Sequence, residues 1–391
     1  RFPAHNTVVV DGRSDYKNML SDYAFALNAC YPEPGNARPL STPYTFSDVV
    51  FTEPSTDARQ QRLTATVRTG ERSGYFVDIF RSARADGKDL KHEYLFHSQG
   101  APITLTDASG SLLETAPTEE LSSAKGDLIG YDYFTKKQAV SFSDDFVAQF
   151  HMPSLSGGRL QVNLWMQGYP DRQLFTVMAP YSRAIAAGSV PDALYQQPLP
   201  TLVVWQPGEA RSRPFVAVIE AFHSEAGAPL KEVAYFFSPK TENTAFAGIA
   251  VHSENGQTDY LFNDESGEEK HVFDRHAFQG TYGVASYEGE ALRSLFLGAG
   301  TLLQSAGWKI ESTENGNAVW IQKNAKKVRI QARHPFRLTI PLPDSGRKKV
   351  SLVTLNEPDK QVYSGKIIVL GKQRFAVFEL PGWEEVQLQL R

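Results

Sequence analysis

The sequence has few of the features that mark several large protein classes. It contains a single cysteine, Cys30, which excludes an intrachain disulfide and a cysteine-based zinc module. No apolar run approaches the roughly 20 residues that a membrane-spanning helix needs, so no membrane insertion is expected. The net charge is only -4 at pH 7. Composition therefore gives no reason to expect a nucleic-acid or anionic-membrane partner.

Several short catalytic motifs are also missing. The chain has no His-Glu-x-x-His, no Gly-x-Ser-x-Gly, no P-loop and no dinucleotide fingerprint, which excludes the enzyme classes that depend on them. It begins at Arg1 with neither an initiator methionine nor a leader. We therefore expect it to be a piece of a longer protein.

What the sequence does contain is a strong strand pattern. Apolar and polar residues alternate over 63–68 and 385–390, and the apolar runs at 202–205 and 215–219 are typical of strands buried on both faces. Turn dipeptides such as Asp11-Gly12 and Asn255-Gly256 punctuate the chain. We predict an all-β fold of stacked antiparallel sheets, a β-supersandwich with little helix. A short helix is considered only for 291–303.

A boundary between two β-rich regions is predicted near Ser238–Asn243. Residues 1–240 would form a central antiparallel β-sandwich that carries a metal site, and residues 241–391 a C-terminal β-sheet region. Residues 14–31 are expected to form an irregular excursion between strands.

Histidines at strand ends are the main candidates for chemistry. His5 precedes the apolar run 7–10, so its side chain can project from a sheet edge into a cleft. In a regular strand over 92–97, His92 and His97 face opposite ways. Asp48 sits where another strand should begin. His5, His92 and Asp48 would suit zinc or a similar divalent ion, but spacing alone favours two unrelated histidines and a hydrogen-bonded Asp.

The ordered motifs resemble those of the heparinase II/III-like polysaccharide lyases. The matching segments are His5–Gly12, Tyr75–Arg81, His92–His97, Val251–Gly256 and Thr281–Gly289. The insertion at 14–42 is similar to the alginate-lyase branch. The resemblance implies stacked β-sheets preceded by an α/α toroid that this chain lacks. It also implies β-elimination on a 4-linked uronic-acid polysaccharide, with alginate favoured and heparin or heparan sulfate next.

The same resemblance implies roles for individual residues. His5, Asp48 and His92 would hold a structural divalent metal, zinc before manganese or calcium, with Asp22 as the alternative to Asp48. Tyr75 and His97 would lie near substrate, although Tyr75 also fits a strand core. Another active-site histidine of the family is replaced here by Pro3. The main catalytic base and acid are expected outside this chain, which alone would be inactive.

The remaining expectations concern context. The partners would be the polysaccharide and a toroid from the same precursor or a second chain; a homo-oligomer is compatible with the sequence. The family resemblance implies a periplasmic or secreted location. The alternatives are a non-catalytic carbohydrate-binding β-sandwich and a purely structural sheet domain.

Overall fold

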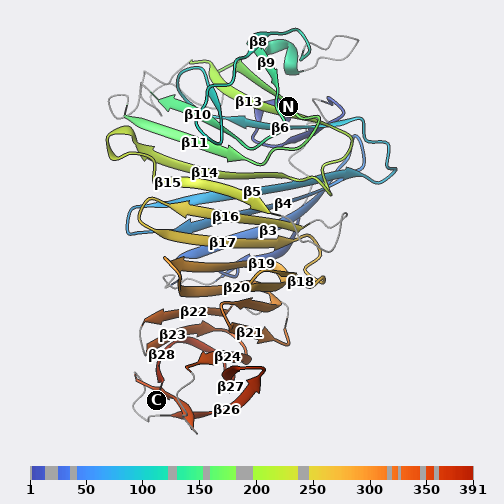
Figure 1. The fold of residues 1–391 in the computed structure, drawn as a ribbon. Coiled ribbons are helices and arrows are strands. Elements are labelled where there is room, and N and C mark those ends of the chain that lie inside the picture. Colours follow the sequence, from blue (N-terminus) through green and yellow to red (C-terminus); the bar gives the residue numbers. More distant parts are fainter. Residues whose placement is uncertain are drawn as a thin grey trace. The chain divides into compact units, whose positions relative to one another are not determined.

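The computed structural model of the chain describes residues 2–13, 25–35, 42–121, 130–152, 159–181, 197–236, 246–314, 319–324, 327–343, 349–355 and 361–390. Within these ranges the chain consists of antiparallel β-strands and has no α-helix (Figure 1). Its helical turns are the short 3-10 segments η1 (Phe2–Ala4), η2 (Gly130–Tyr133) and η5 (Ser224–Ala226). The predicted all-β fold of stacked antiparallel sheets is confirmed. No described helix is long and apolar enough to cross a membrane.

The chain divides into two compact units. The first comprises Arg1–Asn28 and Val49–Ala234, and the second comprises Ala29–Asp48 and Tyr235–Arg391. The segment 238–243, where we predicted the boundary, lies outside the described residues. No pattern in the sequence indicated that residues 29–48 would join the second unit.

A six-stranded sheet in the first unit carries the N-terminal histidine motif. Its spatial order is β1 (Val8–Val10), β6 (Lys91–His97), β13 (Leu199–Pro207), β12 (Gln173–Ala179), β9 (Thr135–Ser141) and β8 (Ala116–Pro117). The runs of Val in β1 and of Leu and Val in β13 are buried on both faces, as their unbroken apolar sequence predicts.

An eight-stranded sheet packs against it. Its order is β2 (Ala26–Tyr31), β3 (Tyr44–Glu53), β4 (Ala58–Arg68), β5 (Gly74–Arg84), β14 (Phe215–His223), β11 (Leu160–Met166), β10 (Phe146–Met152) and β7 (Thr104–Asp107). One core lies between the sheets and joins Val8 and Tyr94 to Phe80, Phe150 and Phe215. A second core covers the other face of the six-stranded sheet.

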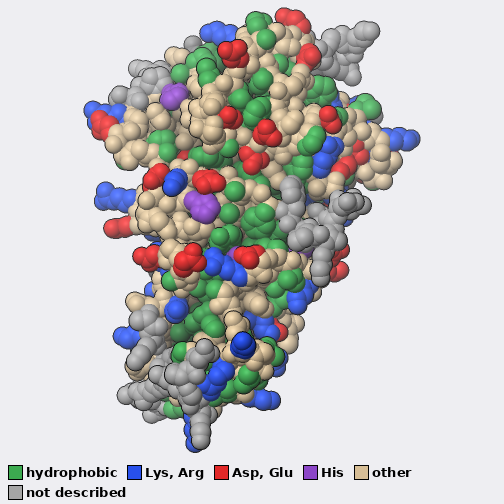
Figure 2. All heavy atoms as spheres, viewed as in Figure 1, with side chains coloured by type: hydrophobic (Ala, Val, Ile, Leu, Met, Phe, Trp, Pro, Cys, Tyr) green, Lys and Arg blue, Asp and Glu red, His purple; other side chains and the backbone are tan. Residues whose placement is uncertain are grey.

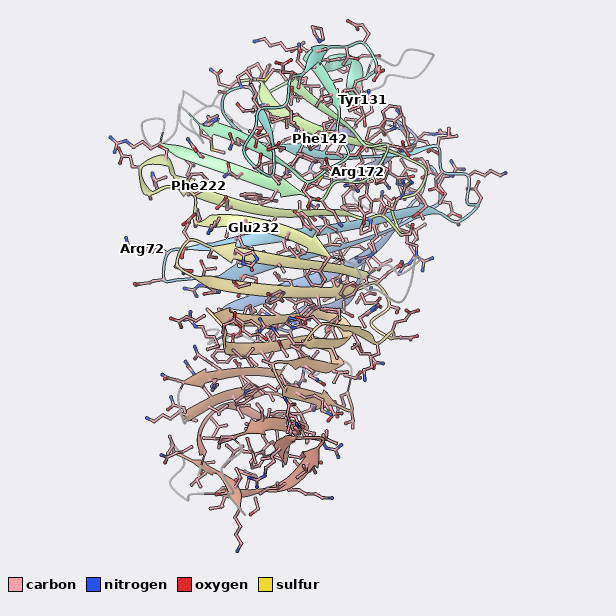
Figure 3. All side chains as sticks on the ribbon, viewed as in Figure 1. Arg72, Tyr131, Phe142, Arg172, Phe222 and Glu232 are labelled. Carbon is pink, nitrogen blue, oxygen red and sulfur yellow. The ribbon has the colours of Figure 1, made fainter. Side chains whose placement is uncertain are left out.

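The buried guanidinium of Arg172, labelled in Figure 3, ties loops to this sandwich. Its Nε donates to Gln206 Oε1 at 2.9 Å, and one of its terminal nitrogens donates to the Pro214 carbonyl at 2.9 Å. The same group stacks over Phe215 at 4.8 Å. A buried charge is tolerated here because several acceptors and an aromatic face replace its water.

A 14-stranded sheet forms most of the second unit. Its strands are β15 (Leu230–Phe236), β16 (Phe246–Ser253), β17 (Gln257–Asp264), β18 (His271–Phe273), β19 (His276–Glu288), β20 (Ala291–Ser305), β21 (Trp308–Ser312), β22 (Val319–Asn324), β23 (Lys327–Ala332), β24 (Phe336–Leu342), β25 (Val350–Thr354), β26 (Val362–Leu370), β27 (Gln373–Leu380) and β28 (Trp383–Leu390). Because β20 pairs with both β21 and β22, the strands from β20 to β28 close into a β-barrel around an apolar core. Closure leaves those strands without an open edge.

The short helix considered for 291–303 is wrong, since these residues form the long strand β20 (Figure 1). The glycines there serve close packing. A Cβ on Gly298 would lie 2.7 Å from the Phe46 ring, and one on Gly300 would lie 2.6 Å from Gly280 Cα. Tight backbone approach therefore explains residues that looked like helix interruptions.

Candidate functional site

The Asn6 side chain extends the pairing of β1 and β6 beyond the last regular residue. The His97 backbone N–H donates to Asn6 Oδ1 at 2.7 Å, and the Leu95 N–H donates to the Thr7 carbonyl at 2.9 Å. Arg62 donates to the Asn6 carbonyl at 2.9 Å. Its guanidinium also donates two hydrogen bonds of 2.8 Å to the Asp78 carboxylate. Asn6, two residues before β1, is therefore hydrogen-bonded both to β6 and to Arg62 of β4.

The register of this pair decides which histidines meet. Val8 faces Tyr94 and Val10 faces His92, so the same register, continued, sets His5 opposite His97. His92 lies at the other end of β6, about 17 Å away at the usual strand rise. It also lies on the other face of the sheet, because side chains alternate along a strand. The structure thus brings His5 to His97 and separates both from His92.

His5 and His97 line a pocket in the first unit with a volume of about 410 Å³. Its remaining walls come from η1, η2 and the ends of β12 and β13. The other lining residues are Pro3, Ala4, Gly130, Tyr133, Phe134, Ala179, Pro180, Tyr181 and Leu199. Tyr133 and Tyr181 are 52% and 42% exposed. The pocket therefore offers aromatic surface to solvent beside two imidazoles.

Packing of η2 builds the wall nearest the histidines. Tyr131, labelled in Figure 3, is buried in the core that covers this face of the six-stranded sheet. Its ring lies edge-on to Phe134 at 5.6 Å, and Phe134 lies edge-on to His97 at 6.4 Å. A Cβ on Gly130 would come within 2.8 Å of the Pro3 ring. Glycine at 130 and proline at 3 thus fit each other.

Hydrogen bonding orients the His97 ring. Its Nδ1 lies 2.7 Å from Thr201 Oγ1, and that hydroxyl donates to the Leu199 carbonyl at 3.1 Å. Thr201 is therefore placed to accept from Nδ1–H, and the buried Nε2 has no hydrogen-bond partner among the described residues. Burial lowers the pKa of His97 to about 4; the Pro3 backbone opposes this shift, and His5 adds to it. Burial also lowers the pKa of His5. Both rings are neutral at pH 7.

The other predicted site residues lie elsewhere. Tyr75 is fully buried in β5, in the core position that its strand context also allowed. His92 is buried with Nε2 2.8 Å from Asp89 Oδ1, and burial lowers the pKa of its ring. Asp48 is 1% exposed on β3 and belongs to the second unit. Asp22 lies outside the described residues.

The proposed metal ligands do not fit a single ion. His5 and His92 occupy opposite ends and opposite faces of the β1–β6 pair. Across the described parts of the chain, no group of three His, Cys, Asp or Glu side chains is arranged to hold a metal ion. No chemical step is therefore assigned to a metal here.

The aromatic wall of the pocket was not identified from the sequence. The run Gly130–Phe134 carries three aromatic residues in five positions. That density is a usable signal for a carbohydrate-facing surface. The strand propensity of aromatics elsewhere in the chain obscured it.

Two comparisons with known proteins bear on this site. Residues 236–322 match a family described as "Endo-acting ulvan lyase C-terminal domain". The chain is also 25% identical over 336 residues to an endo-acting ulvan lyase from Formosa agariphila. That alignment covers 80% of this chain and 38% of the relative. It is longer than the second unit, so it extends into the unit that holds the pocket.

The relative's name specifies ulvan, so the comparisons give no support to the alginate-lyase or heparinase branch. They do support the broader prediction. Over most of its length, the chain is similar to part of a polysaccharide lyase.

Proposed function

We propose that this chain forms the β-rich part of a polysaccharide lyase that cleaves an acidic polysaccharide, with ulvan favoured over alginate and heparan sulfate. The similarity to an endo-acting ulvan lyase supports the substrate. The observation that carries the proposal is the pairing of His5 and His97 in an aromatic-lined pocket.

The pocket suits one sugar unit of an acidic polymer. Tyr133 and Tyr181 present exposed ring faces against which a sugar ring can pack. Imidazole nitrogens can exchange hydrogen bonds with a uronate carboxyl group or a ring hydroxyl. His5 is exposed and can meet a bound sugar directly, whereas Nε2 of His97 is buried and has no hydrogen-bond partner among the described residues.

β-Elimination places three demands on an active site. A base removes the proton at C5, the uronate carboxylate is neutralised, and an acid protonates the leaving oxygen. We assign His97 and His5 to holding the uronate unit. The main base and acid are assigned to a toroid domain outside this chain, which spans only 38% of its relative's length. We also propose that the protein acts in the periplasm or outside the cell, where a polymer is accessible.

The test uses the full-length protein with ulvan, alginate and heparan sulfate as substrates. The ultraviolet absorbance of unsaturated uronate ends should rise with ulvan. His97→Gln and Tyr133→Ala should each lower kcat/KM, while His223→Gln, on an exposed strand end, should not. Binding of ulvan without new unsaturated ends would instead favour a non-catalytic carbohydrate-binding module.

A further inference from the structure

The last 69 residues of the chain differ in charge from the rest. Residues 323–391 hold 14 Lys and Arg against 6 Asp and Glu, a net charge of +8, whereas residues 1–322 hold 26 against 38, a net charge of -12. This stretch follows the segment that matches the ulvan lyase domain family. Over the C-terminal strands in Figure 2, the visible charged side chains are mostly Lys and Arg. Such an asymmetry points to an anionic partner.

A groove of about 870 Å³ lies on the outer side of the barrel strands β21, β24, β27 and β26. These four strands are neighbours in the sheet (Figure 1). Alternate residues of these strands, such as Ile310, Leu338 and Phe378, point into the barrel core. The intervening residues line the groove, so its walls are set by the strand alternation.

Two lysines flank this groove. The pairing registers place Lys309 opposite Thr339, Thr339 opposite Val377, and Val377 opposite Lys366, so one row crosses all four strands. Lys309 Nζ lies 3.0 Å from Glu311. Lys366 is exposed and forms no ion pair with the described residues.

The floor between the lysines combines apolar and polar surface. Phe375 faces Ile368 in the register of β26 and β27, giving an aromatic and aliphatic strip. In the next row Arg337 Nε lies 2.6 Å from Glu379 Oε1, and Arg337 also faces Glu311. Glu311 pairs with Lys309 and Glu379 pairs with Arg337, so the three cations and two carboxylates of the lining leave a net charge of +1, carried by Lys366.

We propose that this groove binds a stretch of the acidic polysaccharide itself, with Lys309 and Lys366 pairing with its anionic groups and Phe375 supporting a sugar ring. The inference rests on the proposed function for its substrate class. The barrel would then hold the polymer at a second place besides the histidine pocket and raise its effective concentration there.

The test measures binding of the 391-residue chain to immobilised ulvan at low salt. Charge neutralisation in Lys309→Gln/Lys366→Gln should weaken binding about tenfold, since each exposed pair contributes modestly. Most of this difference should vanish in about 1 M salt, where charges are screened within about 3 Å. Phe375→Ala should weaken binding at both salt concentrations. Lys231→Gln is the matched control, because Lys231 is exposed and lies in the first unit.

Two results would overturn the inference. One is unchanged affinity in the double lysine variant. The other is equal competition by duplex DNA of the same total charge, which would show an unspecific polyanion surface. Cleavage by the full-length protein is a separate readout. If the full-length protein cleaves ulvan but the groove variants bind it as well as the wild type, this inference alone is rejected. If the groove variants bind more weakly but the full-length protein cleaves nothing, the proposed function alone is rejected.

Discussion

The Arg62–Asp78 pair gives the sharpest stability prediction, because it links the sandwich interior to the histidine pocket. Asp78 accepts two bonds of 2.8 Å from Arg62 and one of 2.9 Å from the Tyr94 hydroxyl. Arg62 in turn donates to the carbonyl of Asn6, which holds His97. Asp78→Ala removes the carboxylate that accepts from the Arg62 guanidinium and from the Tyr94 hydroxyl.

The magnitude follows from burial. The Asp78 side chain is 5% exposed and that of Arg62 is 28% exposed. Breaking a fully buried pair costs about 3–5 kcal/mol, whereas an exposed pair is worth about 0–1 kcal/mol. Because Arg62 retains some water, we expect Asp78→Ala to lower the free energy of unfolding by about 2–4 kcal/mol.

The free energy of unfolding can be measured by urea titration, with hydrogen exchange of peptides covering 58–84 and 91–97 as the readout. These peptides report on the first unit alone. Tyr94→Phe removes only the hydroxyl and should cost about 1 kcal/mol. Arg159→Gln disrupts an exposed pair with Glu225 in the same unit and should change stability by less than about 0.5 kcal/mol. A loss below about 1 kcal/mol in Asp78→Ala would refute the claim that this pair anchors the strand.

Three further predictions follow from the same structure. Burial lowers the pKa of His97 and His276 to about 4, against about 6.5 when unfolded, so the unfolded chain binds these protons first. Stability should therefore fall as pH drops from about 6.5 to about 4, and His276→Gln should flatten that fall in pH-dependent urea titrations. An unchanged fall in the variant would contradict this origin. Since His5 and His92 lie at opposite ends of the β1–β6 pair, dialysis against EDTA should leave the thermal unfolding midpoint unchanged, and a drop restored by zinc but missing in His5→Ala would contradict this separation. Gly100→Ala should cost more than about 2 kcal/mol in urea unfolding, because its φ is +114° and a Cβ would lie 2.0 Å from the His151 carbonyl oxygen; a smaller loss would mean that the backbone there yields.

Periodicity predicted the strands well because alternation marks a strand with one buried face and an unbroken apolar run marks a strand buried on both faces. The alternation over 63–68 and the apolar runs at 202–205 and 215–219 became β4, β13 and β14. The same rule correctly put His92 and His97 on opposite faces. The pattern failed at β20, where the glycines reflect contact with Phe46 and Gly280, residues far away or on another strand.

Pairing register is what the sequence alone could not supply. Parity within one strand separates His92 from His97, but only the register between β1 and β6 shows that His5 belongs with His97. Register depends on contacts between segments some 80 residues apart. A one-residue slip would move His5 away from the face that carries His97. In the structure, His5 lines a pocket together with His97. It does not lie beside His92, with which the family resemblance groups it as a metal ligand.

The most direct measurement is the release of unsaturated uronate ends from ulvan by the full-length protein and by its His97→Gln variant. Our account predicts clear cleavage by the wild type, and a fall in kcat/KM for the variant with its folded state intact by circular dichroism. A folded wild type that yields no unsaturated ends from ulvan, alginate or heparan sulfate would contradict the proposed lyase function. Equal kcat/KM in the two proteins would contradict the role of the histidine pocket.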